Sequence, residues 1–422
     1  MTEADEKGKK RETLSWCMYD WAYSAFATVV ISAVLPVYYS QVAASNLESH
    51  IATAYWGYTT VITLFIAAIL SPVMGAIADY SGMKKRLLLI FAALGIFATA
   101  LLYFIKTGDW LLASLFFIFG NIGFTVSEVF YNSMLPYVAR PGEMDRVSIK
   151  GYIFGYTGGG ILLAIDIAMI ELMSDKLLAT RLSFLTVSIW WAVFTIPLIL
   201  NVKEPPGGRK GQIGANPLTA GFKRLAETFR ELRKYRELAL FLAAFWVYND
   251  GIGTIIKMAT IYGAEIGISQ TALIGALLMT QFVGIPFSFA FGRLAGAIGT
   301  KNSILLGLAV YTGISIGGYF MENAVHFWIL AFLVGTVQGG TQALSRSMFG
   351  SMLPKDKTAE FFGFYGMSSK FAGIVGPLVF AVVSQTTGSS RLSIFSLIAF
   401  FIIGAVMLSR VDVEKGIRAA GE

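Results

Sequence analysis

The chain has 422 residues, of which 55% are hydrophobic and 14% are charged, and its mean hydropathy is +0.65. Soluble domains contain about 25% charged residues, so this composition excludes an ordinary water-soluble protein and indicates one that exposes apolar surface to lipid. The single cysteine, Cys17, excludes an intramolecular disulfide and a cysteine-based metal site, and the two histidines are expected far apart in external loops. We therefore expect no bound metal and no cofactor.

Apolar runs long enough to cross a hydrocarbon core, which takes about 20 residues in a helix, recur along the whole chain. Such runs predict helices, because a lipid-exposed backbone must satisfy its hydrogen bonds within its own segment. The expected fold class is therefore all-α integral membrane. In chain order, twelve transmembrane helices are expected near 15–42, 53–78, 86–106, 110–135, 148–171, 181–202, 237–263, 271–292, 302–321, 327–349, 359–385 and 391–410.

One long polar stretch, 203–236, separates the sixth run from the seventh and is expected to form a cytoplasmic linker. Its charged part has amphipathic helical spacing, which suits either a solvated helix or a helix on the membrane surface. The segments on either side repeat each other, and this predicts two pseudo-symmetric six-helix halves, 1–202 and 237–422. The repeated positions include Gly75, Gly82 and Lys84, which recur as Gly292, Gly299 and Lys301, and the run Ser133–Pro136, which recurs as Ser351–Pro354.

The distribution of positive charge predicts the orientation in the membrane, because cytoplasmic loops retain Lys and Arg. With the N-terminus inside, most of the 33 Lys and Arg residues fall on the cytoplasmic side or at its edge. We expect a multi-pass protein of the cell (inner) membrane with both termini in the cytoplasm, so the net charge of +7 requires no nucleic-acid partner. The exceptions to the charge bias are Lys106, Lys176, Arg181 and Arg391 outside, and Lys257 and Lys370 within helices.

The loop after the second predicted helix reads GAIADYSGMKKR and contains Gly75, Asp79, Gly82, Lys84 and Lys85. It resembles the loop signature of the major facilitator superfamily, G-x-x-x-D-x-x-G-x-[RK]-[RK]. The resemblance implies that Asp79 caps a neighbouring helix, where a carboxylate meets unpaired N–H groups, and helps to latch the outward-open state. Met83 stands where the family commonly has a basic residue, so it is left open whether this loop forms the charge relay of the family. A plain positive-inside loop with a turn glycine is the alternative.

Two further segments narrow the resemblance. SWCMYDWAYSAF, residues 15–26, opens the first predicted helix, and QGGTQALSRS, residues 338–347, lies in the tenth. Both resemble the "unknown major facilitator" family, related to the fungal autophagy-related vacuolar amino-acid effluxers, and the resemblance covers nearly the whole chain. It implies a secondary active or facilitative transporter that exports small organic solutes, amino acids first among them, by alternating access.

The expected partners are thus a small-molecule substrate and the lipid bilayer, with coupling to protons left open and a monomer as the expected assembly. A lipid or amphiphile translocase on the same fold is the alternative function, because one transporter fold serves many solutes. An enzyme is not expected, since the sequence has neither a catalytic constellation nor a G-x-x-x-x-G-K-[ST] phosphate-binding loop.

Polar residues follow one face of helices 1, 4, 7 and 10, which line the central cavity in the family that this chain resembles. Ionisable residues at membrane depth are costly and commonly mark substrate or ion paths. Hydrogen bonding that only joins neighbouring helices is the alternative. The expected substrate path consists of Asp20, Ser24, Asn121, Glu128, Asn249, Asp250, Lys257, Gln338, Gln342 and Lys370.

Two pairs of these ionisable residues support sharper hypotheses. Glu128 and Arg346 lie at equivalent positions of the two repeats with opposite charges, and we predict that they pair as a gate when the cytoplasmic side is closed. Alternatively, each finds a partner on a neighbouring helix. Asp20 and Asp250 are expected to take a substrate ammonium group or a transported proton, with a lysine of the same path as the balancing charge.

Overall fold

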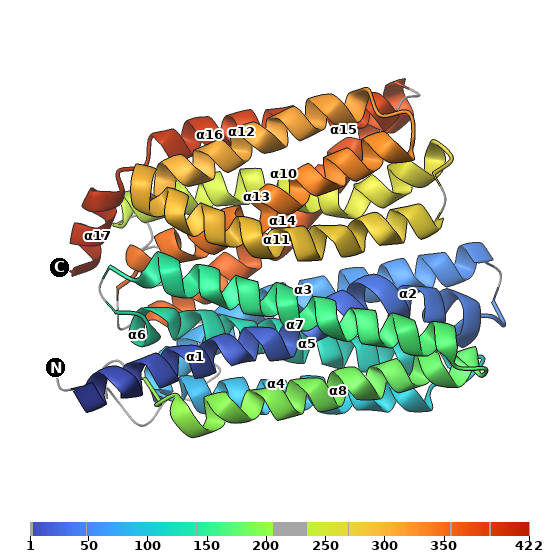
Figure 1. Cartoon of the computed structure of the whole chain (residues 1–422), viewed down its shortest axis with the longest axis horizontal. Coiled ribbons are helices and arrows are strands. Elements are labelled where there is room, and N and C mark those ends of the chain that lie inside the picture. Colours follow the sequence, from blue (N-terminus) through green and yellow to red (C-terminus); the bar gives the residue numbers. More distant parts are fainter. Residues whose placement is uncertain are drawn as a thin grey trace. The chain divides into compact units, whose positions relative to one another are not determined.

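The computed structural model describes residues 3–47, 49–140, 142–205, 234–268, 270–354, 357–387 and 390–421. Within these ranges every regular element is a helix and no strand occurs (Figure 1). The all-α fold class expected from the sequence is therefore confirmed for this part of the chain. The predicted linker, 203–236, falls mostly outside the described residues, because 206–233 are not among them.

Each of the twelve predicted apolar runs falls on a helix or on a set of consecutive helices. The helices up to residue 201 are α1 (Glu3–Ala25), the π-helical η1 (Phe26–Val34), α2 (Leu35–Tyr38), the π-helical η2 (Tyr39–Ala43), α3 (Ser49–Ser81), α4 (Lys84–Leu101), the short η3 (Leu102–Phe104), α5 (Trp110–Ser133), α6 (Leu135–Val138), α7 (Met144–Leu172) and α8 (Lys176–Asn201). From residue 236 they are α10 (Arg236–Glu265), α11 (Gln270–Ile298), α12 (Thr300–Tyr319), α13 (Ala324–Ser351), α14 (Thr358–Thr387), α15 (Ser390–Ser396), α16 (Ile398–Ser409) and α17 (Val413–Gly421).

Ten helical stretches in the described part of the chain are long and apolar enough to cross a membrane. α12 and α14 are not among these ten, although they coincide with the predicted runs 302–321 and 359–385. The ten stretches are Glu6–Ala43, Tyr58–Ser81, Lys84–Phe104, Trp110–Val138, Met144–Leu172, Lys176–Asn201, Arg236–Ile256, Gly275–Ile298, Ala324–Ser351 and Arg391–Ser409.

The chain divides into two compact units whose boundaries cut through two helices. The first unit comprises residues 1–139, 154–221 and 358–363, and the second comprises 140–153, 222–357 and 364–422. The beginning of α7 therefore packs within the second unit, and the beginning of α14 packs within the first. These short segments, 144–153 and 358–363, are called the exchanged segments below.

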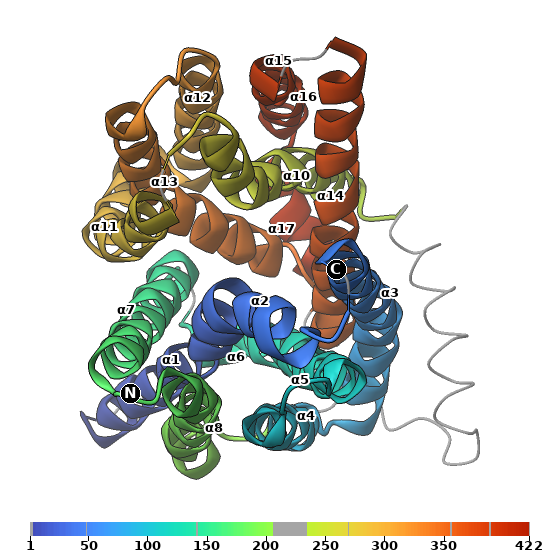
Figure 2. The ribbon, with the colours of Figure 1, turned by 90° about the vertical axis from the view of Figure 1, so that its right-hand side faces the viewer.

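In the first unit, α4 packs against α5 and α1 packs against α8, as the end-on view of Figure 2 shows. The α4–α5 contact depends on two glycines. A Cβ atom at Gly123 would lie 2.4 Å from the backbone nitrogen of Gly95, and one at Gly95 would lie 2.5 Å from the buried ring of Trp191. Any side chain at either position would push the helices apart, so small residues set this spacing.

In the second unit, α11 packs against α13, and α10 packs against α16. Glycines again allow the close approach. A Cβ atom at Gly340 would lie 2.2 Å from the ring of Phe291, and one at Gly404 would lie 2.7 Å from Cβ of Tyr248. The two units thus pack membrane helices in the same way, with glycines that leave room for a neighbouring backbone or ring.

The turns after α3 and after α11 each contain a glycine with a positive φ angle. Gly82 has φ 65° and Gly299 has φ 86°, a region that side-chain-bearing residues rarely adopt. These two glycines form one of the pairs that repeat along the sequence. The repeat therefore has a structural basis at this position, because each turn must reverse the chain directly into the next helix.

Candidate functional site

Asp20 lies buried on α1, with 4% of its surface exposed, and is held by hydroxyl groups. Its Oδ2 accepts a hydrogen bond from the hydroxyl of Tyr131 on α5 at 2.9 Å, and its Oδ1 accepts one from Ser24 at 3.3 Å. A Cβ atom at Gly155 would lie 2.8 Å from Oδ1, so α7 closes the third side of the carboxylate. The predicted residues Asp20 and Ser24 therefore lie together at a junction of α1, α5 and α7.

An aromatic cluster surrounds Tyr131 and fixes the position of its hydroxyl group. The ring of Trp16 stacks on Tyr131 with centroids 4.2 Å apart, and the indole N–H donates to the carbonyl oxygen of Tyr131 at 3.0 Å. Tyr19 and Tyr23 lie against the same ring at 5.3 and 5.7 Å. Sequence reasoning missed Tyr131, although it stands one helical turn after Glu128 on the polar face of α5.

Asp250 occupies the corresponding place in the second unit, on α10, and is 2% exposed. Its Oδ2 accepts a hydrogen bond from the backbone N–H of Gly376 on α14 at 2.9 Å. Gly376 precedes Pro377, a residue that interrupts helical hydrogen bonding, and a Cβ atom at Gly376 would lie 1.9 Å from Thr254 Oγ1. In each unit, a buried carboxylate from one long helix thus lies against a glycine of another.

The remaining residues of the expected path are buried or partly buried. On α5, Thr125 donates to Asn121 Oδ1 at 3.0 Å, and both are buried. On α13, Ser345 bonds to the carbonyl oxygen of Thr341 at 2.7 Å and to the hydroxyl of Tyr248 at 2.7 Å. The side chains of Lys257 and Lys370 lie outside the described part of the structure. The partly exposed members are Ser24, Glu128, Asn249, Gln338 and Gln342.

Arg346 on α13 is 2% exposed and forms hydrogen bonds with the first exchanged segment. Its Nε donates to Ser148 Oγ at 2.8 Å, its Nη2 donates to the carbonyl oxygen of Ser148 at 2.6 Å, and its guanidinium lies 4.5 Å from the ring centroid of Tyr152. Ser148 Oγ in turn donates to the carbonyl oxygen of Ala343 at 2.7 Å. Glu128 belongs to the other unit, so its pairing with Arg346 stays a prediction.

The same exchanged segment also contacts α11 and α12. Asp145 accepts a hydrogen bond from the hydroxyl of Thr300, which stands at the start of α12. A Cβ atom at Gly292 would lie 3.2 Å from Cδ1 of Ile149, so the glycine leaves room for that side chain. The beginning of α7 is therefore fixed within the second unit by an arginine, an acid and close packing together.

Asp79, near the end of α3, lies against the first turn of α14, which belongs to the second exchanged segment, and is 1% exposed. Its Oδ2 accepts a hydrogen bond from the backbone N–H of Glu360 at 2.7 Å, and its Oδ1 lies 2.7 Å from Nζ of Lys84. Lys84 also donates to the hydroxyl of Thr358 at 2.7 Å. A carboxylate at this place meets unpaired N–H groups and the positive end of the helix dipole.

Close backbone contact accompanies the Asp79 hydrogen bond. A Cβ atom at Gly75 would lie 2.3 Å from the carbonyl oxygen of Ala359, and one at Gly363 would lie 2.6 Å from Cα of Pro72. The first turns of α14 therefore rest directly on the backbone of α3. The spacing of Gly75 and Asp79 in the loop suits this contact, because the glycine and the acid both face the exchanged segment.

The other lysine of the loop contacts α8 instead of the exchanged segment. Lys85 Nζ donates to the carbonyl oxygens of Ile199 and Val202 at 2.7 and 2.6 Å, and its backbone N–H donates to Glu204 at 2.7 Å. A cation at the C-terminal end of a helix satisfies carbonyl groups that have no partner in the helix. Lys84 alone therefore supplies the amine beside Asp79, and Lys85 fastens the loop.

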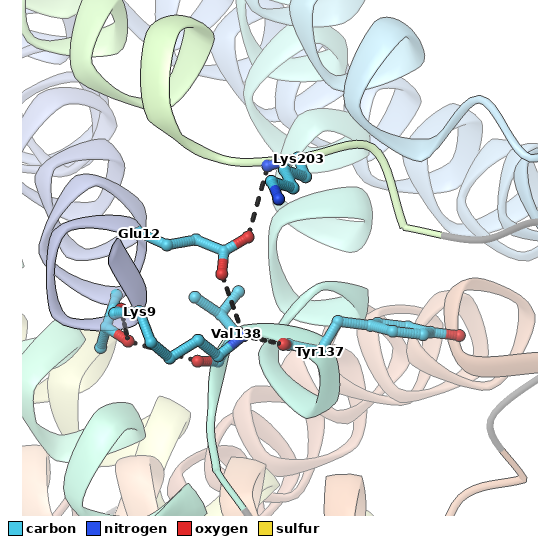
Figure 3. A network of polar contacts seen from close by, with 6 residues as sticks. Lys9, Glu12, Tyr137, Val138 and Lys203 are labelled. Carbon is cyan, nitrogen blue, oxygen red and sulfur yellow. Dashed lines mark hydrogen bonds and ion pairs between the residues drawn. The ribbon is translucent and has the colours of Figure 1, made fainter. Parts of the chain in front are cut away.

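The N-terminal end of α1 is fastened to α6 by the network in Figure 3. Lys9 Nζ donates to the carbonyl oxygen of Tyr137 at 2.6 Å and lies 2.9 Å from Oε2 of Glu12. Glu12 Oε1 accepts a hydrogen bond from the backbone N–H of Lys203 at 3.3 Å. The ring centroid of Tyr137 lies 4.7 Å from Nζ of Lys84, so the network reaches the loop motif.

Metal-binding chemistry has no visible basis in the described residues, which contain no group of three or more His, Cys, Asp and Glu side chains that could hold an ion. The polar groups that come together are carboxylates, hydroxyls, amides and one buried guanidinium. Such groups can bind a small charged or zwitterionic solute, or hold helices together.

Relatives with known sequences cover almost the whole chain. The family model described as "Vacuole effluxer Atg22 like" matches residues 47–144 and 142–421. A Bacillus subtilis (strain 168) protein named "Uncharacterized MFS-type transporter YxiO" is 44% identical over 409 residues, which span 95% of this chain and 94% of that protein. Autophagy-related protein 22-1 of Aspergillus niger is 23% identical over 97% of this chain and 90% of its own length.

Solved structures of membrane transporters share the fold. The proton:xylose symporter XylE bound to 6-bromo-6-deoxy-D-glucose superposes with a TM-score of 0.74 at 12% identity, covering 96% of each chain. FucP in the outward conformation gives a TM-score of 0.71 at 11% identity over 95% of this chain and 98% of that chain. These likenesses establish a multi-pass membrane protein with the fold of the major facilitator superfamily, and the protein belongs to the Atg22-like family of that superfamily, as its resemblance indicated.

Proposed function

We propose that this transporter exports small zwitterionic solutes, amino acids first among them, by alternating access across the cell membrane. The observation that carries the proposal is the pair of buried carboxylates, Asp20 and Asp250, at corresponding places of the two units. An ionisable residue at membrane depth is costly to keep and is retained where it binds a solute or an ion. The description of the matched family, a vacuole effluxer, supports the movement of solutes across a membrane.

The surroundings of Asp20 suit an ammonium group. The carboxylate of Asp20 offers an ion-pair partner, and the aromatic cluster around Tyr131, which bonds to it, offers ring faces to which cations are attracted. A zwitterion also requires a cationic partner for its carboxyl group. We assign this role to Lys370, a member of the expected path.

We propose further that the exchanged segments form the cytoplasmic gate. Asp79 and Lys84 hold the beginning of α14, while Arg346 holds the beginning of α7. Breaking these contacts would free both segments when the transporter opens inward. In this proposal, the buried groups exchange one set of hydrogen bonds for another when the transporter changes between its closed and inward-open states. Such an exchange is required because the loss of a buried hydrogen bond without replacement is costly.

The topology completes the proposal. With α12 and α14 added to the ten apolar stretches, twelve helices would cross the membrane, and the positive-inside rule supports a cytoplasmic location for both termini. The halves 1–202 and 237–422 would each contribute six helices, and the protein would act as a monomer because the fold encloses its own path.

Counterflow in proteoliposomes tests the proposed function. Vesicles are loaded with one amino acid at a time, and uptake of the same labelled amino acid is followed without any ion gradient. We expect uptake for a subset of the panel, with a loss of at least about tenfold in Asp20→Asn, because the proposed ion pair with the substrate ammonium group is lost. The matched control is Asp175→Asn, because Asp175 is the N-cap residue of α8 and asparagine caps a helix equally well.

The same preparation distinguishes the alternative, a lipid or amphiphile translocase, from an amino-acid exporter. If no amino acid gives counterflow although a thermal unfolding transition shows that the protein is folded, the amino-acid proposal fails. The same vesicles then receive a fluorescent phospholipid, and its protein-dependent movement between leaflets would support the translocase.

A further inference from the structure

Asp166 is a buried carboxyl group that the proposed path does not use. It lies on α7 in the apolar run ILLAIDIAMI and is 0% exposed. Leu172, the last residue of α7, is six residues away, so Asp166 stands about 9 Å from that end of the helix. An ionised carboxylate is expensive at such a place unless it is paired.

The hydrogen bonds around Asp166 indicate its protonation state. Thr186 Oγ1 on α8 lies 2.7 Å from Asp166 Oδ1 and 2.8 Å from the carbonyl oxygen of Ser183. A threonine hydroxyl carries one proton and can donate only one full hydrogen bond. Both short contacts are satisfied together if the Asp166 carboxyl group is protonated and donates to Thr186, which then donates to Ser183.

The second oxygen of the carboxyl group leads to the same conclusion. Asp166 Oδ2 is fully buried and has no hydrogen-bond partner among the residues that the structure describes. An unpartnered carbonyl oxygen of a neutral acid costs much less than an unpartnered oxygen that carries negative charge.

The charged residues of the surrounding elements are engaged elsewhere. On α8, Lys176 lies 3.7 Å from Glu171, which is on α7 itself, and Arg181 Nε donates to the carbonyl oxygen of Tyr103 at 2.6 Å. η1 reaches α7 through Thr28 and contains no charged residue, and Tyr38, the nearest titratable residue after it, donates to a carbonyl oxygen. Asp20 meets α7 at Gly155, three helical turns from Asp166.

We propose that Asp166 is a proton-binding site that couples solute movement to a proton gradient. In the present conformation it holds the proton in the sealed contact with Thr186. In another conformation of the cycle, α7 and α8 would admit water, the O–H bond would break, and the proton would leave to water with a carboxylate remaining. This inference rests on the proposed transport function and deepens it by naming the coupled ion and its site.

The substitution Asp166→Asn separates coupling from structure. The amide Nδ2 can donate to Thr186 in place of the acid proton, so the variant imitates the protonated state and keeps the packing of α7 on α8. Two activities of the reconstituted protein are measured with an amino acid that the wild type exchanges: counterflow without a gradient, and accumulation driven by an imposed pH gradient of either polarity. Asp175→Asn is again the matched control.

We expect Asp166→Asn to retain counterflow within about twofold of wild type and to lose accumulation driven by the pH gradient, while Asp175→Asn keeps both. Gradient-driven accumulation that persists in Asp166→Asn would overturn the proposal. A wild type that exchanges solute but shows no response to either gradient would overturn it as well and would leave the proposed transport function standing.

A measurement on the wild type covers the case in which Asp166→Asn does not fold or the wild type exchanges no amino acid. A hydrophobic carbodiimide reacts with protonated carboxyl groups, and peptide mass spectrometry locates the product. We expect modification of Asp166 at pH 7.5, because the acid is protonated and the reagent reaches it whenever α7 and α8 separate during the conformational cycle. Absence of modification at this pH would overturn the proposal, whatever the outcome of the counterflow panel.

Discussion

Gly75→Ala should release the beginning of α14 from α3. The added Cβ would lie 2.3 Å from the carbonyl oxygen of Ala359 and 2.8 Å from its carbonyl carbon, and neither is the end of a flexible side chain. Ordinary contact needs more than about 3.4 Å, so the backbone of α14 must move by about 1 Å. That movement breaks the 2.7 Å hydrogen bond from the Glu360 N–H to Asp79. Loss of a hydrogen bond to a charged group costs about 1.5–3 kcal/mol, and crowding adds about 1 kcal/mol or more.

The combined effect, about 2.5–4 kcal/mol, corresponds to roughly 70- to 1000-fold easier opening of the segment. Amide hydrogen exchange measures it directly, because the Glu360 N–H is itself an exchanging group. We expect faster deuterium uptake in peptides covering residues 358–363 and little change in α4 or α5. Gly313→Ala is the control, since its Cβ would meet nothing within 4 Å and should stabilise α12 slightly. Equal exchange in the two variants would refute the assigned role of the close contact.

Three further predictions concern the buried polar groups. Tyr131→Phe keeps the stacking on Trp16 but removes the donor to Asp20, and should lower counterflow about tenfold or more, as substrate titrations of the reconstituted variant would reveal. Arg346→Lys keeps the charge but loses the forked contact with Ser148, so hydrogen exchange in residues 144–153 should accelerate more than in Ser148→Ala; the opposite order would contradict the clamp. Glu128→Arg and Arg346→Glu should each abolish transport, and their combination should restore part of it; a double variant no better than the singles speaks against the gate pair.

The positions of the helices could be predicted from the sequence because lipid imposes one strong constraint. A segment that crosses the membrane must be long, apolar and helical, and every predicted run falls on a helix of the described chain. The turn glycines were equally visible, because Gly82 and Gly299 recur with the same spacing to a lysine. Their positive φ angles explain why glycine stands at both places.

The candidate site was predictable only in part. Asp20 and Ser24 form one stripe of α1, and their contact follows from helical spacing alone. The hydroxyl of Tyr131 could not be assigned to Asp20 in the same way, since that contact depends on how α1 and α5 are placed side by side. Asp166 was visible as a lone acid in an apolar run, but α7 is the fifth predicted helix and is not among those that line the cavity in the family that the chain resembles.

The exchanged segments were beyond the reach of sequence patterns, because partners such as Ser148 and Arg346 are far apart in the chain and have no periodic relation. They carry a consequence for dissecting the protein. A fragment ending at residue 202 would lack 358–363, and a fragment beginning at 237 would lack 144–153, so each would leave Asp79 or Arg346 buried without the contacts described above. Co-expression of the two fragments would supply each with its missing piece, so the chain should tolerate a break between its halves only when both are synthesised together.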